Sequence, residues 1–279
     1  MKSKIVFNNL AHSYTDGSMI KYTSVSTLVG RYKKPYNSEY WSKYKAYEKI
    51  IGKDKFKVLK KGFRMEDPSL FDYLNNFVGA EELNSAIIDI LKDWENERDK
   101  SIIKGNEYHS YKEMQAKHLG YCLNPYSGIE CKTIESTKIY VKDNIEFREP
   151  HFESLMDLED GFHPELILWN NKHKIAGQAD KVFIETIDGV KYAEIDDYKT
   201  NKKIATSSIF GKMLDPLSHL DDCNYNHYRL QISTYAWLLE QENYVIRNTG
   251  FTHLNKKYIF PYMKEEVELM LGISKFDKI

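Results

Sequence analysis

The chain of 279 residues lacks several features that mark whole classes of protein. It has three cysteines, one fewer than a four-cysteine iron–sulfur cluster needs, so we expect no such cluster. Cys122 and Cys131 could bridge, but we expect them to stay reduced in an intracellular protein. The sequence has no apolar run long enough for a signal peptide or a membrane span, which predicts a soluble, cytoplasmic protein without a membrane partner.

Net charge is also lacking, because 40 basic residues face 41 acidic ones. A chain this balanced does not attract polyanions through its total charge. The sequence contains neither the His-Glu-x-x-His motif of zinc peptidases nor the phosphate-binding loop of nucleotide-driven motors, so any ATP-driven unwinding must come from a partner. It also has no long Pro-, Gly- or Ser-rich linker. We therefore expect one compact unit, with an N-terminal strand and helical portion over residues 1–100 and a core over residues 101–279.

What the chain does contain is a strong hairpin signal. Residues 174–185 and 190–200 are both rich in β-branched and aromatic side chains, and the Asp-Gly pair between them is typical of a tight hairpin turn. Side chains alternate across a strand, so Asp197 and Lys199 share one face. The pairing that the turn predicts brings Asp180 to the end of the second strand. We therefore expect Asp180, Asp197 and Lys199 to converge.

Such a convergence suits the chemistry of a divalent metal. Two carboxylates at close range repel each other unless a cation or a proton lies between them. Hard oxygen ligands suit one or two Mg²⁺ or Mn²⁺ ions, and a neighbouring lysine can orient water or stabilise an oxyanion during phosphodiester hydrolysis. The alternative is a solvated ion pair on a strand edge, because Glu130 and Lys132 repeat the acid-x-Lys spacing elsewhere in the chain.

Four ordered motifs resemble those of the RecB-like branch of the PD-(D/E)XK nucleases. They are a helix with Gly, His and Glu, a Gly-x-x-Asp strand, an Asp-x-Lys strand and a Gln-x-x-x-Tyr helix, here at residues 105–113, 177–180, 197–199 and 231–235. The likeness is strongest to phage-encoded exonucleases and to the mitochondrial genome maintenance exonuclease. Further stretches, at residues 22–28 and 222–231, extend the resemblance over most of the chain.

The resemblance implies roles for residues on the upstream helix. His109 and Glu113 are four residues apart in a stretch that is typical of a helix, so they share a face. The resemblance implies that His109 is a metal ligand and that Glu113 is a further ligand or supports one, although Glu107 is nearby. The alternative is an exposed helix with an isolated histidine. The resemblance also allows the backbone carbonyl of Tyr198 to complete the ligand set.

Two further positions lie beside the expected centre. Glu165 begins a strand that should pair with the next one through an Asn-Asn turn, and it resembles an acidic residue that would hold Lys199 from a second layer. A solvent-facing carboxylate is the alternative. Gln231 and Tyr235 share a face of an amphipathic helix over residues 227–240, and the resemblance places them among the catalytic residues. They could otherwise be ordinary rim residues.

The distribution of charge suggests where DNA would bind. Between residues 31 and 61 there are eleven basic residues against three acidic ones, interleaved with tyrosine, tryptophan and phenylalanine. A basic groove with aromatic rings can hold an unpaired strand without sequence preference. The candidate contacts are Lys33, Lys34, Tyr36, Trp41, Lys43 and Lys45. A solvated helix is the alternative, since several of these aromatic rings must pack.

These observations converge on one expectation. The resemblance implies an α/β or α+β fold with a restriction-endonuclease-like αβββαβ core and a mixed sheet, preceded by the N-terminal portion. It implies a metal-dependent deoxyribonuclease, most simply an exonuclease acting on single strands or DNA ends in recombination or repair, with a helicase or recombination protein as partner. A phage origin would place it in the host cytoplasm. A structure-specific endonuclease and a catalytically silent DNA-binding module remain as alternatives.

Overall fold

The structure is a computed structural model and describes residues 5–209 and 211–273. The chain divides into two compact units, of which the first comprises residues 1–34 and 105–279 and the second residues 35–104. The sequence predicts that residues 1–100 form one N-terminal portion, whereas in the structure residues 1–34 belong to the same unit as the core. Residues 6–24 form three short strands that join the sheet of the first unit, and this pairing explains the difference.

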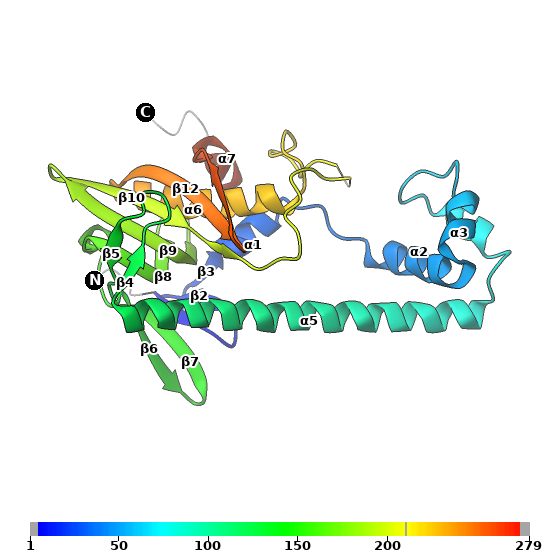
Figure 1. Ribbon diagram of the computed structural model, residues 1–279, viewed down its shortest axis with the longest axis horizontal. Coiled ribbons are helices and arrows are strands. Elements are labelled where there is room, and N and C mark those ends of the chain that lie inside the picture. Colours follow the sequence, from blue (N-terminus) through cyan, green and yellow to red (C-terminus); the bar gives the residue numbers. More distant parts are fainter. Residues whose placement is uncertain (1–4, 210, 274–279) are drawn as a thin grey trace. The chain divides into compact units, whose positions relative to one another are not determined.

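A mixed sheet of 11 strands, counted in the described residues, builds the first unit (Figure 1). Its order is β11-β12-β10-β9-β3-β2-β1-β7-β6, with β13 on β12 and β8 on β9. The strands are β1 (Val6–Asn8), β2 (Ser13–Thr15), β3 (Lys21–Ser24), β6 (Thr137–Lys142), β7 (Ile145–Pro150), β8 (Gly161–Asn170), β9 (Ile175–Ile187), β10 (Val190–Asp196), β11 (Tyr198–Lys199), β12 (Val245–His253) and β13 (Lys256–Phe260). A separate pair consists of β4 (Tyr121–Leu123) and β5 (Glu130–Lys132).

The centre of this sheet is the predicted hairpin with one strand added on each side. Val190 lies opposite Ile187, so β9 and β10 pair through the Asp-Gly turn and the prediction is confirmed. β8 pairs with β9 antiparallel, from Asn170 opposite Ile175 onward. After a helical crossover the chain returns as β12, which runs parallel to β10. The expected mixed sheet and α/β architecture are therefore present.

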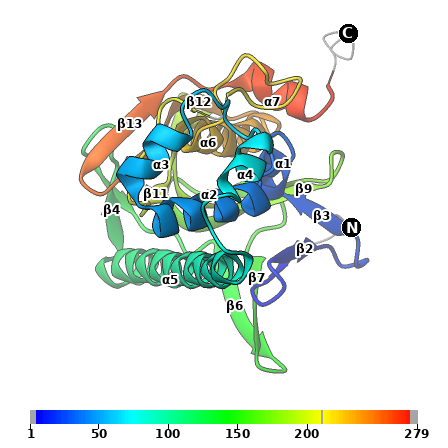
Figure 2. The ribbon, with the colours of Figure 1, turned by 90° about the vertical axis from the view of Figure 1, so that its right-hand side faces the viewer.

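Helices cover both faces of these strands (Figure 2). On one face α6 (Asn224–Glu240) packs against the sheet together with α1 (Val25–Gly30) and α7 (Lys264–Met270). On the other face Ala116, from the end of α5 (Ala80–Leu119), packs against Phe162 and Phe183. A short 3₁₀ turn, η1 (Leu155–Asp157), precedes β8. Most of the apolar side chains on the α6 face are fully buried, so this face forms the main core.

The second unit consists of α2 (Ser38–Ile51), α3 (Lys53–Leu59), α4 (Ser69–Leu74) and the first part of α5. Its core contains Tyr47, Phe56, Leu70 and Leu74. Tyr47 is 1 % exposed, which confirms that part of the tyrosine face predicted for this segment packs inward.

Two elements differ from the sequence expectation. The sequence predicts separate helices at residues 81–99 and 107–117, whereas α5 is one continuous helix of 40 residues. No proline interrupts it, and a single glycine costs a helix only about 1 kcal/mol. The sequence also predicts a strand near Tyr258, which is β13, but misses the central strand β12. Within the described part of the chain, none of the helices is both long and apolar enough to cross a membrane.

Candidate metal centre

Three carboxylates lie side by side, on β8, on β9 and at the residue that directly follows β10. The register that pairs Pro164 with Lys181 and Leu166 with Ala179 sets Glu165 opposite Asp180. The register of the hairpin, which ends with Asp196 opposite Lys181, continues to bring Asp197 beside Asp180. We call Glu165, Asp180 and Asp197 the carboxylate row. The predicted approach of Asp180 and Asp197 follows directly from the hairpin.

The row lies where the central strands separate. Beyond Asp196 the chain leaves β9 and continues as β11, which pairs with β12. The opposite end of β9 pairs instead with β3, from Ile175 onward. Strands that diverge leave room between them for side chains and ligands. Asp180 and Asp197 are nevertheless only 8 % and 2 % exposed, which excludes the solvated ion pair as an explanation for this motif.

Glu165 has a backbone conformation that is unusual inside a strand. Its φ is +49°, in the left-handed region that costs a residue with a side chain about 1–2 kcal/mol. The Thr137 hydroxyl donates to its carbonyl at 3.3 Å. Strain of this kind persists only where the surrounding structure holds it, and here it directs the Glu165 side chain toward the row.

His109 reaches the row from α5. Its Nδ1 lies 3.2 Å from Asp180 Oδ1 and 3.7 Å from Glu165 Oε1. Each of the three residues offers one ligand atom, and these atoms all lie within 4.8 Å of one another. The structure thus brings the predicted ligands His109 and Asp180 together and adds Glu165 to them. This placement excludes the alternative of an isolated, solvent-facing histidine.

The electrostatics of the row favour a cation. Burial raises the pKa of Asp197, and the Asp180 charge adds to this, so that the pKa reaches about 7 despite Lys199. Burial also raises the pKa of Glu165. Burial alone would lower the pKa of His109, but hydrogen bonds to Asp180 and Glu165 outweigh it and raise the value to about 11. In the absence of another cation, protons on these groups therefore balance the carboxylates.

Lys199 lies on the other side of Asp197. Its ammonium forms an ion pair with Asp197 and donates to Gln231 Oε1 at 3.4 Å. It also lies 4.5 Å from the centre of the Tyr228 ring. Burial alone would lower the pKa of Lys199, but the charges of Asp197 and Asp180 outweigh it and raise the pKa. The lysine is therefore a fixed positive charge at neutral pH.

Gln231 and Tyr235 support this lysine from α6. Gln231 Nε2 donates to the Tyr235 hydroxyl at 3.1 Å, and Tyr235 is 3 % exposed. A Cβ atom at Gly177 would lie 2.7 Å from the Tyr235 ring and 2.8 Å from Val25, so only glycine allows this approach. Gly177, the first residue of the Gly-x-x-Asp motif, thus has a packing reason. The two predicted α6 residues lie beside Lys199 and are not rim residues.

The residues present fit a divalent metal. Asp197 Oδ2 is buried, and within the described residues it lies against the Lys199 ammonium without a hydrogen bond of good geometry. The imidazole of His109 and the carboxylates of Glu165 and Asp180 supply the mixed nitrogen and oxygen donors that Mn²⁺ accepts, and the carboxylate oxygens suit Mg²⁺. Asp197 lies beside this group, against Lys199. Burying this many carboxylates is stable only with compensating charge.

Tyr198 and Glu113, two further residues predicted as metal ligands, make other contacts in the structure. The Tyr198 N–H donates to Asp180 Oδ2 at 2.7 Å, which orients that carboxylate, while a role for the Tyr198 carbonyl stays a prediction. Glu113 lies outside the group, because Lys117 and Arg148 hold its carboxylate at 2.9 Å and 3.3 Å. Its spacing from His109 on the helix was correct, but the cations on its other side determine where it points.

Glu165 also differs from its predicted role. The sequence places it behind Lys199, at the start of a strand, or in solvent. In the structure it lies inside β8 with 14 % of its side chain exposed, next to His109 and Asp180. Asp180 stands between it and Asp197, the residue that pairs with Lys199. Glu165 is therefore a candidate ligand, and the position of the row across three strands explains why.

The residues predicted to bind DNA fall into two places. Burial lowers the pKa of Lys33, and Asp222 opposes this effect. The charge of Lys199 lowers the pKa of Lys33 further, so Lys33 lies near the candidate metal centre. The Lys34 N–H donates to Asp222 Oδ2 at 2.7 Å in the same unit. In the second unit Trp41 donates to Glu66 at 3.0 Å, while Lys43 and Lys45 pair with Glu39 and Glu48 at 2.8 Å and 2.6 Å. Tyr36 is 60 % exposed.

Sequence reasoning missed two features of this region. Tyr228 lies under Lys199, and its spacing from Gln231 and Tyr235 along one helical face could have identified it. On the reverse side of the same strands, Asp196 pairs with Lys181 and Lys257 and accepts from Thr252 at 3.0 Å. That cluster depends on β12 and β13, and without β12 the sequence could not assemble it.

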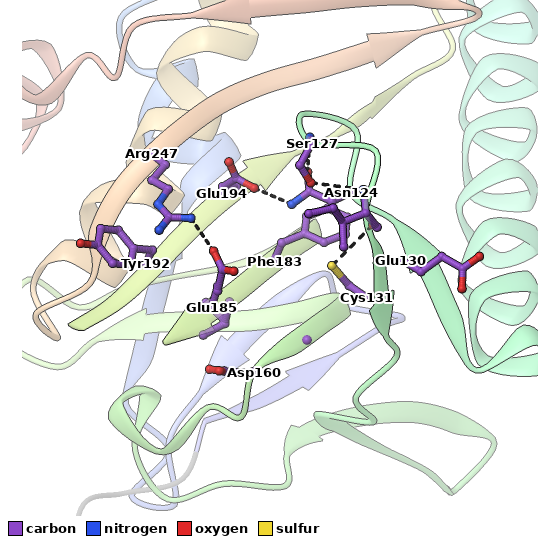
Figure 3. A pocket seen from close by; sticks show the side chains of 13 residues that line it. Asn124, Ser127, Glu130, Cys131, Asp160, Phe183, Glu185, Tyr192, Glu194 and Arg247 are labelled. Atoms are coloured by element: carbon purple, nitrogen blue, oxygen red, sulfur yellow. Dashed lines mark hydrogen bonds and ion pairs between the residues drawn. The ribbon is translucent and has the colours of Figure 1, made fainter. Parts of the chain in front are cut away.

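A cavity of about 390 Å³ also opens on the reverse face, which carries Phe183 and Glu194 (Figure 3). Glu185 pairs with Arg247 at 2.5 Å, and Asn124 donates to Glu194 at 2.5 Å. Glu185 and Glu194 thus pair with other residues that line this cavity, whereas the carboxylate row has more acids than basic partners.

Comparison with models of known protein families and with curated proteins found no match to this chain. The candidate centre therefore rests on its geometry.

Proposed function

We propose that this protein is a Mg²⁺- or Mn²⁺-dependent deoxyribonuclease with a RecB-like PD-(D/E)XK centre. The observation that carries the proposal is the meeting of Asp180, Asp197 and Lys199 with His109 and Glu165 where the central strands separate. These residues come from four separate elements, so chance alignment of a short motif does not explain them.

The order of elements supports a restriction-endonuclease-like core. After α5 the chain first forms β4 to β7 and then the antiparallel strands β8, β9 and β10, followed by α6 and by β12 parallel to β10. With β4 to β7 taken as an insertion, this order agrees with the αβββαβ core that the resemblance implies. Asp180 lies on the second of these strands, β9, while Asp197 directly follows the third, β10, and Lys199 lies on β11.

Asp180, Asp197, Glu165 and His109 would hold the metal. When bound, the ion would neutralise charge on the scissile phosphate and make a water molecule more acidic. Asp180 is oriented for this by the Tyr198 N–H. A bound ion would replace the protons that otherwise balance the carboxylate row, so one compensating positive charge would take the place of another.

Lys199 would act on the reacting phosphate. Its raised pKa keeps the ammonium charged at neutral pH, so it can donate to an attacking water or to a developing oxyanion but does not serve as the base. Gln231 fixes one of its donors, and Tyr235 fixes Gln231 in turn. Fixed donors of this kind typically contribute a factor of about 10² to 10³ in rate.

Digestion of labelled DNA tests the proposal. The full chain is incubated with end-labelled single-stranded, duplex and closed circular DNA, with Mg²⁺, Mn²⁺ or EDTA. We expect metal-dependent release of nucleotides from ends or single strands, no cutting of closed circles, and loss of activity in Asp180→Asn and Lys199→Ala. Cutting of closed circles would instead identify an endonuclease. Activity in both variants equal to that of the parent would refute the centre, and metal-independent binding without turnover would identify a silent DNA-binding module.

A further inference from the structure

The second unit contains a cavity of about 360 Å³ between α2, the start of α3 and the first part of α5. Three lysines, two acidic residues, an isoleucine and a tryptophan line it, namely Lys45, Glu48, Lys49, Lys53, Ile90, Asp93 and Trp94. A positive charge and an indole ring thus share one concave site on this unit.

The charges around this cavity are unequally paired. Lys45 pairs with Glu48 at 2.6 Å, so these two charges largely cancel. Lys49 and Lys53 are exposed, and neither forms an ion pair within the described part of the chain. Gly52, with φ +86°, ends α2 between them and lets α3 begin at Lys53. Lys49 and Lys53, four residues apart, and the Asp93 carboxylate therefore remain around the cavity, which leaves an excess of one positive charge.

The aromatic wall is suited to an unpaired base. Trp94 is half-buried and packs with Ile90 on the inner side. Tyr36 meets the Trp94 ring edge-on at 5.9 Å and is 60 % exposed. Stacking on aromatic rings does not depend on sequence, because every base has a π-face. The bases of a duplex already stack on one another, so this wall favours a single strand.

We propose that this cavity is a binding subsite for single-stranded DNA, with Lys49 and Lys53 on consecutive phosphates and Trp94 stacking on a base. The inference rests on the proposed nuclease function for its biological substrate. It also revises the predicted contacts, because Trp41 and Lys43 are engaged with Glu66 and Glu39. The strand-binding residues of the second unit then lie further along α2 (Lys49), at the start of α3 (Lys53) and on α5 (Trp94).

Anisotropy of a fluorescein-labelled oligo-dT, titrated with the full chain in EDTA, tests the phosphate contacts. Lys49→Gln/Lys53→Gln should weaken binding about tenfold and flatten the salt dependence, since each lost phosphate contact removes about 0.7 from the log–log slope. The matched control is Lys57→Gln/Lys61→Gln, which removes two exposed lysines from the same basic stretch outside the cavity. Equal weakening in both pairs, unchanged binding in the first pair, or no binding by the parent would each overturn the subsite.

Tryptophan substitutions test the stacking. Trp94→Leu keeps an apolar side chain for Ile90 but removes the large ring, and it should weaken oligo-dT binding about fivefold or more. Trp94→Phe should retain most of the affinity, and both variants should unfold at similar denaturant concentrations. Leucine binding as tightly as phenylalanine would overturn the stacking role. Because EDTA prevents turnover, these outcomes are independent of the cleavage assay: a chain without nuclease activity would refute the proposed function and leave this subsite standing.

Discussion

Two charged clusters lie on opposite sides of the same strands. Adjacent residues alternate across a strand, so Asp197 joins the carboxylate row while its neighbour Asp196 points to the reverse side. On the reverse side Asp196 is fully buried between Lys181 and Lys257, one acid between two bases. The three acids of the carboxylate row have one histidine, His109, and one lysine, Lys199, beside them.

This difference separates a structural cluster from a functional one. The lysines of the reverse cluster each have an aromatic neighbour, since Lys181 lies 3.9 Å from the Tyr198 ring and Lys257 lies 3.9 Å from the Tyr126 ring. Burial lowers the pKa of Lys257 to about 8 against the effect of Asp196, so near that pH the chain can balance this cluster by losing one lysine proton. The row instead relies on raised pKa values and bound protons. A buried cluster with more carboxylates than basic side chains thus favours a bound cation.

The largest expected effect is on stability, and it should distinguish neighbouring aspartates. Asp196→Asn leaves the buried Lys181 without its counterion, and breaking such a pair costs about 3–5 kcal/mol. Asp197 has a raised pKa, so its ionised form opposes folding above the unfolded value near 3.8 and increasingly up to about pH 7. At pH 8 without metal, Asp197→Asn should therefore not lower the free energy of unfolding.

Urea unfolding of the two variants and the parent at pH 8 in EDTA measures this difference. Equal losses of stability in both would contradict the distinction between the clusters. A larger loss of stability in Asp197→Asn than in Asp196→Asn would mean that the carboxylate row, and not the reverse cluster, stabilises the fold.

The second expected effect is on catalysis and compares two lysines. Lys199→Ala should reduce the rate of DNA hydrolysis about 10²- to 10³-fold, because it removes a fixed donor beside the row. Lys181→Ala should destabilise the protein but keep the rate per folded molecule within about tenfold of the parent. Single-turnover digestion, normalised to the folded fraction from circular dichroism, separates the two quantities. A greater catalytic loss in Lys181→Ala would move the catalytic charge to the reverse face.

Metal binding gives a third comparison. A ligand at 100 times its dissociation constant stabilises a folded protein by about 2.7 kcal/mol. Saturating Mn²⁺ should raise the melting temperature of the parent, and EDTA should reverse this. Asp180→Asn and Glu165→Gln should lose the shift, whereas Asp196→Asn should keep it, starting from a lower melting temperature. If Mn²⁺ raised the melting temperature of Glu165→Gln as much as that of the parent, Glu165 would not be a metal ligand.

The predictability of these two clusters from sequence differs for a physical reason. The hairpin fixes Asp180 beside Asp197 through local turn chemistry, and the sequence predicted it. Glu165 required the register of β8, and the reverse cluster required β12 and β13, which join across α6. The sequence of β12 has only a weak strand pattern, because Arg247, Asn248 and Gly250 interrupt its apolar residues. The helical spacing correctly predicts that Glu113 shares a face of α5 with His109. It does not reveal that Arg148, which is distant in sequence, pairs with the Glu113 carboxylate.

The smallest expected effect concerns pH, and it isolates Asp197 within the row. Without metal, His109 has a pKa near 11 and Asp197 a pKa near 7, so both must release protons before they can act as ligands. Mn²⁺ affinity should therefore rise with pH, and more steeply below pH 7, where Asp197 must also release its proton. Isothermal titration in buffers of different ionisation enthalpy counts these protons. Asp197→Asn should bind more weakly but with one slope throughout. A break in slope that persists in this variant would assign the second proton to another group.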